Sequence, residues 1–401
     1  MATKLRARIL GTLLGPGVLA LGLTALHLIA PSNINRNAWP WQFPAFVKEQ
    51  GIFFMLAWHD QVGPLASRPL MSALIRALAT LSGSLTVGYV GAILGSYWIA
   101  GLALQHAARR LAHDRGIATL VVFGASFTVL FAFFAPVYSH DDLLQYAFVF
   151  FALAWLDERP WRAGLLLCLA MIARETTVLL IPGLTLLLWF RPDTGTTVGR
   201  RKTLAVVAVV LLPAAFYLFY RRLLPFPDVA DRFEHWRFNF ESTNRAFESL
   251  LSPLLALLVV GAVASIAYRV QPESIRRYRP WLVAFAVTFA VNTPLVFVAT
   301  RAREARLFAL PLVFVWPIAG EWLVTANAAW RAARRELSWK KCVALPALVP
   351  TALVGAVVLA LYHRTVAGSF YDGFRAYIIA VAYATAALHI AISSMPRRPA
   401  G

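Results

Sequence analysis

Four short clusters of charged residues interrupt a chain that is otherwise mostly apolar. They are Trp58-His59-Asp60-Gln61, Ser139-His140-Asp141-Asp142, Ala173-Arg174-Glu175-Thr176 and Arg301-Ala302-Arg303-Glu304-Ala305-Arg306. Carboxylates and imidazoles transfer protons in catalysis, and the guanidinium group of arginine binds phosphate oxygens. Charge at or near the depth of a lipid bilayer is costly, so by default it marks a functional site. We therefore expect the clusters to contribute to one site if they face the same side of a membrane.

Asp60 is a candidate general base. Segment 31–81 contains only two acids, Glu49 and Asp60, and Asp60 directly follows His59. A carboxylate in this segment could take the proton from an acceptor hydroxyl. The alternative is an acid that lies in a surface loop or caps a helix.

A pair of acids, Asp141 and Asp142, follows His140 and opens an apolar segment. One acid at a helix N-terminus is explained by capping and by the helix dipole, but two in a row exceed that need. The pair could orient an acceptor or bind a cation. Together with His59 and Asp60 it could complete an oxygen and nitrogen site for a divalent metal, although spacing alone does not show that the two pairs converge. The sequence thus requires no cofactor and leaves a divalent metal open.

Arg174 and Glu175 separate two short apolar segments, and Pro182 follows a few residues later. A break in the backbone at this depth is tolerated only where protein buries it or where it lines a cavity. The functional interpretation is that Arg174 meets a phosphate. The alternative is a buried ion pair that stabilises the break.

The fourth cluster carries three arginines, Arg301, Arg303 and Arg306, together with Glu304. The fork of the guanidinium group suits phosphate oxygens, and it would stabilise the charge that develops as a phosphate departs. The alternative is contact with lipid headgroups.

The composition indicates that these residues are carried by a polytopic membrane protein. The chain has 401 residues, of which 59% are hydrophobic and 14% charged, whereas a soluble domain carries about 25% charged residues. No long polar stretch separates a second domain, so we expect one all-α transmembrane bundle over 1–401. The twelve apolar segments that we predict to form it are 9–30, 82–106, 117–137, 142–156, 162–173, 177–190, 203–220, 251–268, 281–299, 307–326, 343–361 and 376–394.

The loops between these segments predict the topology. With the N-terminus in the cytoplasm, 23 of the 38 lysines and arginines but only six of the 19 acids fall on the cytoplasmic side. This asymmetry follows the positive-inside rule. It places both termini inside and all four charged clusters on the outer face. Joining 162–190 into one helix would give eleven spans and would export the basic loops at 200–202 and 331–341, against the rule.

Two outer loops are long, namely 31–81 and 221–250. Within 66–81, apolar residues recur at helical spacing with Arg68 and Arg76 among them. This pattern predicts an amphipathic helix on the outer membrane surface.

Several other classes of function are disfavoured. The net charge of +19 does not indicate nucleic-acid binding, because the basic residues cluster in short loops between apolar segments. The chain contains no phosphate-binding Walker loop, no dinucleotide fingerprint and no Gly-x-Ser-x-Gly elbow. The two cysteines, Cys168 and Cys342, lack metal-ligand spacing. Because the chain has no nucleotide-binding motif, we expect an activated donor to arrive through the membrane.

The layout resembles the GT-C superfamily of integral-membrane glycosyltransferases. The likeness rests on a first helix, a long outer loop with an acid and an amphipathic helix, the run YSHDDLLQYAFVFFALAWLDERPWRAGLLLCLAMIARETTVLLIPG, and the later run REARLFALPLVFVWP. The resemblance implies a polyprenyl-phosphate sugar as donor. It also implies an acid of the first outer loop as base, which is Asp60 here, with Asp141 or Asp142 assisting.

We therefore expect a sugar transferase in a bacterial-type inner membrane, with its site facing the periplasm or cell exterior. Its partners would be membrane lipid and the lipid-linked donor. Two alternatives stay open. A transporter or lipid flippase would use the same arginines to bind an anionic lipid-linked substrate, but its site must be reachable from both sides. A glycan polymerase or ligase would need a lipid-linked acceptor.

Overall fold

The computed structural model describes residues 2–29, 49–61, 68–111, 116–131, 141–190, 203–223, 232–270, 272–300, 302 and 305–333. Throughout these residues the regular structure is helical and contains no strand, which confirms the all-α prediction. The predicted segments 343–361 and 376–394 lie outside the described residues.

The described residues of the other ten predicted segments lie almost entirely in helical elements. These are α1 (Ala2–Ile29), α6 (Leu85–Leu111), α7 (Gly116–Phe131), α9 (Asp141–Trp155), α10 (Pro160–Ala173), η1 (Glu175–Leu180) with α11 (Ile181–Phe190), η2 (Val207–Leu211) with α13 (Leu212–Leu223), α15 (Thr243–Val270), α17 (Arg279–Ala299), and η3 (Ala305–Phe308) and η4 (Leu310–Phe314) with α18 (Trp316–Ala333). Four shorter helices complete the described part, namely α3 (Glu49–Gln61), α5 (Pro69–Ser82), α14 (Arg232–Phe240) and α16 (Pro272–Arg277).

Three helices of the described part are long and apolar enough to cross a membrane, and they are Leu85–Leu111, Thr203–Leu223 and Arg279–Ala299. Large apolar side chains also lie on the outside of the bundle. Val121 is 56% exposed, Leu218 65% and Trp189 69%. An apolar exterior of this kind suits helices that face lipid.

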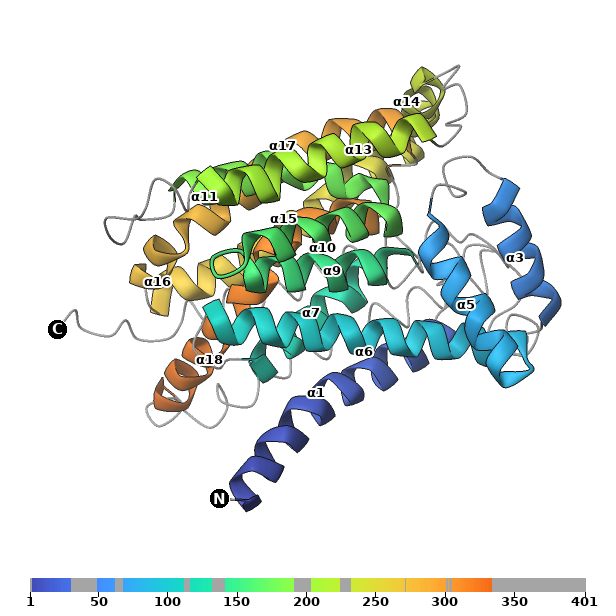
Figure 1. Ribbon diagram of the computed structural model, residues 1–401. Coiled ribbons are helices and arrows are strands. Elements are labelled where there is room, and N and C mark those ends of the chain that lie inside the picture. Colours follow the sequence, from blue (N-terminus) through green and yellow to red (C-terminus); the bar gives the residue numbers. More distant parts are fainter. Residues whose placement is uncertain are drawn as a thin grey trace, which may run out of the picture.

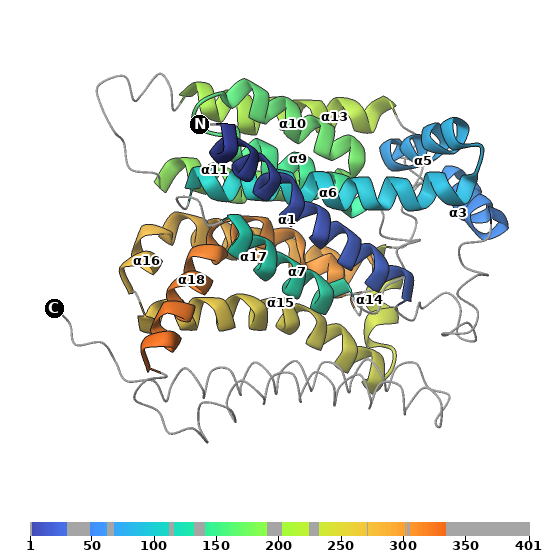
Figure 2. The ribbon, with the colours of Figure 1, turned by 90° about the horizontal axis from the view of Figure 1, so that it is seen from below.

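The long helices run side by side along the bundle, and the short helices gather at its ends (Figures 1 and 2). α3, α5 and α14 lie at one end, whereas α16 and the start of α1 lie at the other. The two long loops predicted from the sequence, 31–81 and 221–250, thus supply helices to the same end of the molecule.

Aromatic side chains fill the centre of the bundle between α7, α9 and α18. The ring of Trp316 contacts Phe123 and Tyr146 edge to face, with ring centroids 4.9 Å and 5.6 Å away. Its Nε1 donates a hydrogen bond of 2.6 Å to Oγ of Ser126. This packing anchors the start of α18, and with it the turns η3 and η4 that precede α18 in the chain.

The predicted segment 307–326 is not one continuous α-helix. It consists of the 3₁₀ turns η3 and η4 followed by α18. Pro311 and Pro317 lack an amide hydrogen, so neither can donate the bond that would continue an α-helix through its position. The irregular stretch brings Arg306 to the end of the bundle where α17 finishes.

Candidate functional site

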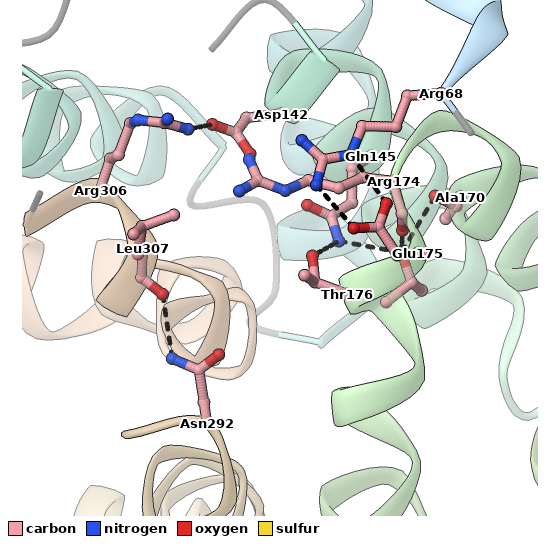
Figure 3. A network of polar contacts seen from close by, with 11 residues as sticks. Arg68, Asp142, Gln145, Ala170, Arg174, Glu175, Thr176, Asn292, Arg306 and Leu307 are labelled. Carbon is pink, nitrogen blue, oxygen red and sulfur yellow. Dashed lines mark hydrogen bonds and ion pairs between the residues drawn. The ribbon is translucent and has the colours of Figure 1, made fainter. Parts of the chain in front are cut away.

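A buried carboxylate lies between two arginines at the start of α9. One oxygen of Asp142, Oδ1, pairs with Nη1 of Arg174, and the other, Oδ2, lies 3.0 Å from Nη1 of Arg306. The side chain of Asp142 is 3% exposed, and each arginine side chain is 8% exposed. Figure 3 shows the two guanidinium groups approaching this carboxylate from different elements. The structure therefore brings together three of the predicted site residues.

Arg174 lies at the end of α10, where the chain leaves the helical path. Its backbone is extended, with φ −159° and ψ 119°, and the 3₁₀ turn η1 begins at the next residue. This confirms the break predicted between the two short apolar segments. Gln145 of α9 donates a 2.9 Å hydrogen bond to Oγ1 of Thr177, and that hydroxyl lies 2.8 Å from the carbonyl oxygen of Arg174. The broken backbone is thereby attached to the helix that carries Asp142.

A second ion pair adjoins the first. Arg68, just before α5, donates two hydrogen bonds to Glu175, from Nε at 2.8 Å and from Nη2 at 2.6 Å. Burial alone would raise the pKa of the Glu175 carboxyl, but the charge and hydrogen bonds of Arg68 hold that pKa below its usual range. The alternative expected from the sequence was a buried ion pair that stabilises the break. The structure has two ion pairs there, because Glu175 pairs with Arg68 and Arg174 pairs with Asp142.

A side chain of α17 binds η3, the turn that carries Arg306. Nδ2 of Asn292 donates a 2.9 Å hydrogen bond to the carbonyl oxygen of Leu307 (Figure 3). Asn292 was not among the predicted site residues. A lone asparagine within the apolar segment 281–299 was the signal that could have indicated it, because polar groups at membrane depth are costly.

Asp60 and His59 lie on α3, far from Asp142 in the sequence. The Asp60 side chain is 51% exposed and pairs with Arg76 of α5, whereas His59 is buried. The role of Asp60 as a base stays a prediction. Asp141 begins α9, and its side chain is not described. The predicted residues that lie outside the described part of the chain are His140, Arg301, Arg303 and Glu304.

The metal site that the two His-Asp pairs could form stays a prediction, because His140 and the Asp141 side chain are not described. No group of three or more histidine, cysteine, aspartate and glutamate side chains suited to a metal ion occurs in the described ranges. The described buried cluster is a carboxylate and guanidinium assembly, which suits oxyanions.

The described charged side chains of the cluster carry a net positive charge. Arg68, Arg174 and Arg306 contribute three positive charges, and Asp142 and Glu175 contribute two negative ones. An excess positive charge in a buried place attracts an anion, since water screens it poorly there. The arrangement can therefore bind a phosphate group through the two arginines around Asp142.

Comparison with known proteins gives no match. No protein-family model, no curated protein and no solved structure matches this chain. The case for a function therefore rests on the residues and their geometry.

Proposed function

We propose that the protein is a membrane glycosyltransferase. It moves a sugar from a polyprenyl-phosphate donor to an acceptor on the outer face of a bacterial-type inner membrane. The observation that carries this proposal is the buried arrangement of Arg174 and Arg306 on either side of Asp142. Two guanidinium groups converging at the end of a bundle of apolar helices suit a phosphate that is attached to a lipid.

The proposed topology has twelve membrane segments with both termini in the cytoplasm. The distribution of basic residues over the loops supports it. So does the arrangement of the short helices, because α3, α5 and α14 of the two long loops share one end of the bundle (Figure 2). The charged cluster belongs to that same end, since Arg68 directly precedes α5. This end would face the periplasm or the cell exterior.

In this proposal the two arginines around Asp142 hold the donor phosphate. Both oxygens of the Asp142 carboxylate already take a guanidinium group, so its role is to orient the two arginines. A phosphate that reached the same guanidinium groups would gain charge-assisted hydrogen bonds, and these strengthen as negative charge develops on the leaving group.

The proposed base is Asp60, because half of its side chain is exposed and an acceptor hydroxyl can reach it. The Asp60 carboxylate takes the hydroxyl proton while the acceptor oxygen forms a bond to the anomeric carbon of the sugar. The bond from that carbon to the phosphate oxygen breaks, and its electron pair leaves with polyprenyl phosphate. The resemblance to the GT-C superfamily supports this assignment, and Asp141 is the second candidate for the base.

The test is transfer of a labelled sugar by purified protein in lipid, using a panel of polyprenyl-phosphate sugars as donors. We expect transfer by the natural protein and a loss of at least about tenfold in Arg306→Gln, since one phosphate contact is removed. Arg276→Gln replaces an exposed arginine of α16 at the other end of the bundle and is expected to keep full transfer.

The same experiment separates the transferase from the flippase. Absence of transfer from every donor, combined with movement of a lipid-linked sugar across the bilayer, would contradict the proposed transferase and support a transporter.

A further inference from the structure

A buried asparagine of α14 makes three hydrogen bonds to the main chain at the end of α17. Nδ2 of Asn239 donates to the carbonyl oxygens of Phe297 and Thr300, each at 2.9 Å. Its Oδ1 accepts a 3.0 Å hydrogen bond from the amide of Ala302. The side chain is 1% exposed.

These bonds satisfy main-chain groups that the helix leaves open. The last carbonyl groups of a helix have no partner within it, and here two of the acceptors lie at or just past the end of α17, at Phe297 and Thr300. Only an amide side chain of this length presents two donors and one acceptor from one point. Asn239 therefore holds the main chain where it turns out of α17.

Arg306 follows these main-chain groups closely in the sequence. Ala302 precedes Arg306 by four residues, and the following residue, Leu307, is bound through its carbonyl oxygen by Asn292. Two asparagines thus hold the main chain on both sides of Arg306, one from α14 and one from within α17.

Aromatic packing joins α14 to this junction as well. The ring of Phe240 stacks on Phe297 with centroids 5.7 Å apart, and Phe297 contacts Phe308 at 6.0 Å. Phe308 is the last residue of η3, the turn that carries Arg306. The ring of Phe297 on α17 thus links α14 to the turn that carries Arg306.

We propose that Asn239 is a positioning residue that holds Arg306 at the phosphate-binding cluster. It acts through the main-chain groups of Phe297, Thr300 and Ala302 and so couples α14, a helix of the outer loop 221–250, to the arginine. The inference rests on the proposed function for the identity of the ligand, which is a phosphate. The part that concerns the position of Arg306 does not depend on that function. Because Nη1 of Arg306 lies 3.0 Å from Asp142, a shift of the segment by about 1 Å would break this contact.

Asn239→Asp is the matched test, because it keeps the shape of the side chain and replaces two donors by an acceptor that faces two carbonyl oxygens. We expect kcat for sugar transfer to fall by roughly 10- to 100-fold, as for other misplaced groups, with the KM for the acceptor unchanged. Asn327→Asp, an exposed site on α18, is the control and should keep full activity.

A double-mutant cycle distinguishes positioning from simple stabilisation. If Asn239 acts through Arg306, then Asn239→Asp causes little further loss of kcat in the Arg306→Gln background. Losses that multiply fully would overturn the proposal. If Asn239→Asp fails to fold, Asn239→Ala removes the same bonds without adding a charge and replaces it in the cycle.

The cycle is also measured as thermal unfolding, which needs no activity. The two losses of Tm should combine to less than their sum, because Asn239→Asp already weakens the contact between Arg306 and Asp142. If no donor supports transfer but the Tm losses are non-additive, the proposed function fails while the positioning of Arg306 stands. Additive Tm losses would contradict the positioning role whatever the activity.

Discussion

Asp142 determines the charge balance of the buried cluster. It is the one described carboxylate that contacts both Arg174 and Arg306, and all three side chains are nearly inaccessible. Removing one partner of a buried ion pair leaves the other charge uncompensated, which costs about 3–5 kcal/mol. We predict that Asp142→Asn lowers the free energy of unfolding by about this amount.

Asp60→Asn is the matched control, since it makes the same chemical change in an ion pair that is half exposed. Exposed pairs contribute about 0–1 kcal/mol, so this variant should unfold close to the natural protein. Unfolding in denaturant or by heat measures both. Equal losses in the two variants would mean that burial of Asp142 does not govern its contribution.

Glu175 makes the stability of the protein depend on pH. Its pKa is held below the usual range in the folded state, and its unfolded pKa is about 4.3. The ion pair with Arg68 therefore stabilises the fold fully above about pH 4.3, and this contribution is lost as the pH falls toward the lower folded pKa.

We predict that Glu175→Gln flattens the dependence of Tm on pH in this acidic range. The natural protein should lose Tm more steeply than the variant as the pH falls below about 4.3, because only it has this carboxylate to protonate. Parallel curves for the two proteins would show that the Glu175 carboxyl titrates alike in both states.

At the scale of elements, one glycine permits the closest approach between α10 and the π-helical turn η2. An added Cβ at Gly164 would overlap the carbonyl oxygen of Ala208 and would lie 2.9 Å from its carbonyl carbon. A backbone carbonyl cannot turn aside as a flexible side chain can. The contact lies on α10, the helix that ends at Ala173 just before the break.

We predict that Gly164→Ala destabilises the protein by about 1–3 kcal/mol, the usual cost of overpacking. Gly95→Ala is its control on α6, where an added Cβ meets nothing within 4 Å and where alanine favours the helix. Thermal unfolding of the two variants in lipid measures the difference. A Gly164→Ala protein as stable as the Gly95→Ala protein would contradict this packing.

The elements were largely predictable and their contacts were not. Apolar length predicted the helices, and the charged pair Arg174-Glu175 predicted the break after α10, since two charges rarely continue an apolar helix. The partner of Glu175 lies 107 residues away at Arg68, and no periodicity links the two. The bonds of Asn239 across 58 to 63 residues are equally invisible in the sequence.

At the scale of the whole molecule, the proposed topology places the turn after α9 in the cytoplasm and the turn after α14 outside. Glu158 and Glu241 mark these turns, and their side chains are 62% and 64% exposed. Cysteines at the two positions, in a chain whose own Cys168 and Cys342 are replaced, report on which side each lies.

We predict that a membrane-impermeant maleimide labels Glu241→Cys in intact cells, and Glu158→Cys only after the cells are permeabilised. The reason is the excess of basic residues in the loops assigned to the cytoplasm. The reverse labelling pattern would mean that the protein has the opposite orientation in the membrane. Labelling of both cysteines in intact cells would mean that the two turns lie on the same side of the membrane.

The most direct test of the central claim is sugar transfer by the natural protein and by Asp60→Asn, measured side by side with polyprenyl-phosphate donors in lipid. We predict that the natural protein transfers the label, and that Asp60→Asn keeps its Tm while losing turnover by about 100-fold or more, as for removal of a general base. Near-normal turnover in Asp60→Asn would contradict the assigned base, and absence of transfer by the natural protein from every donor would contradict the transferase itself.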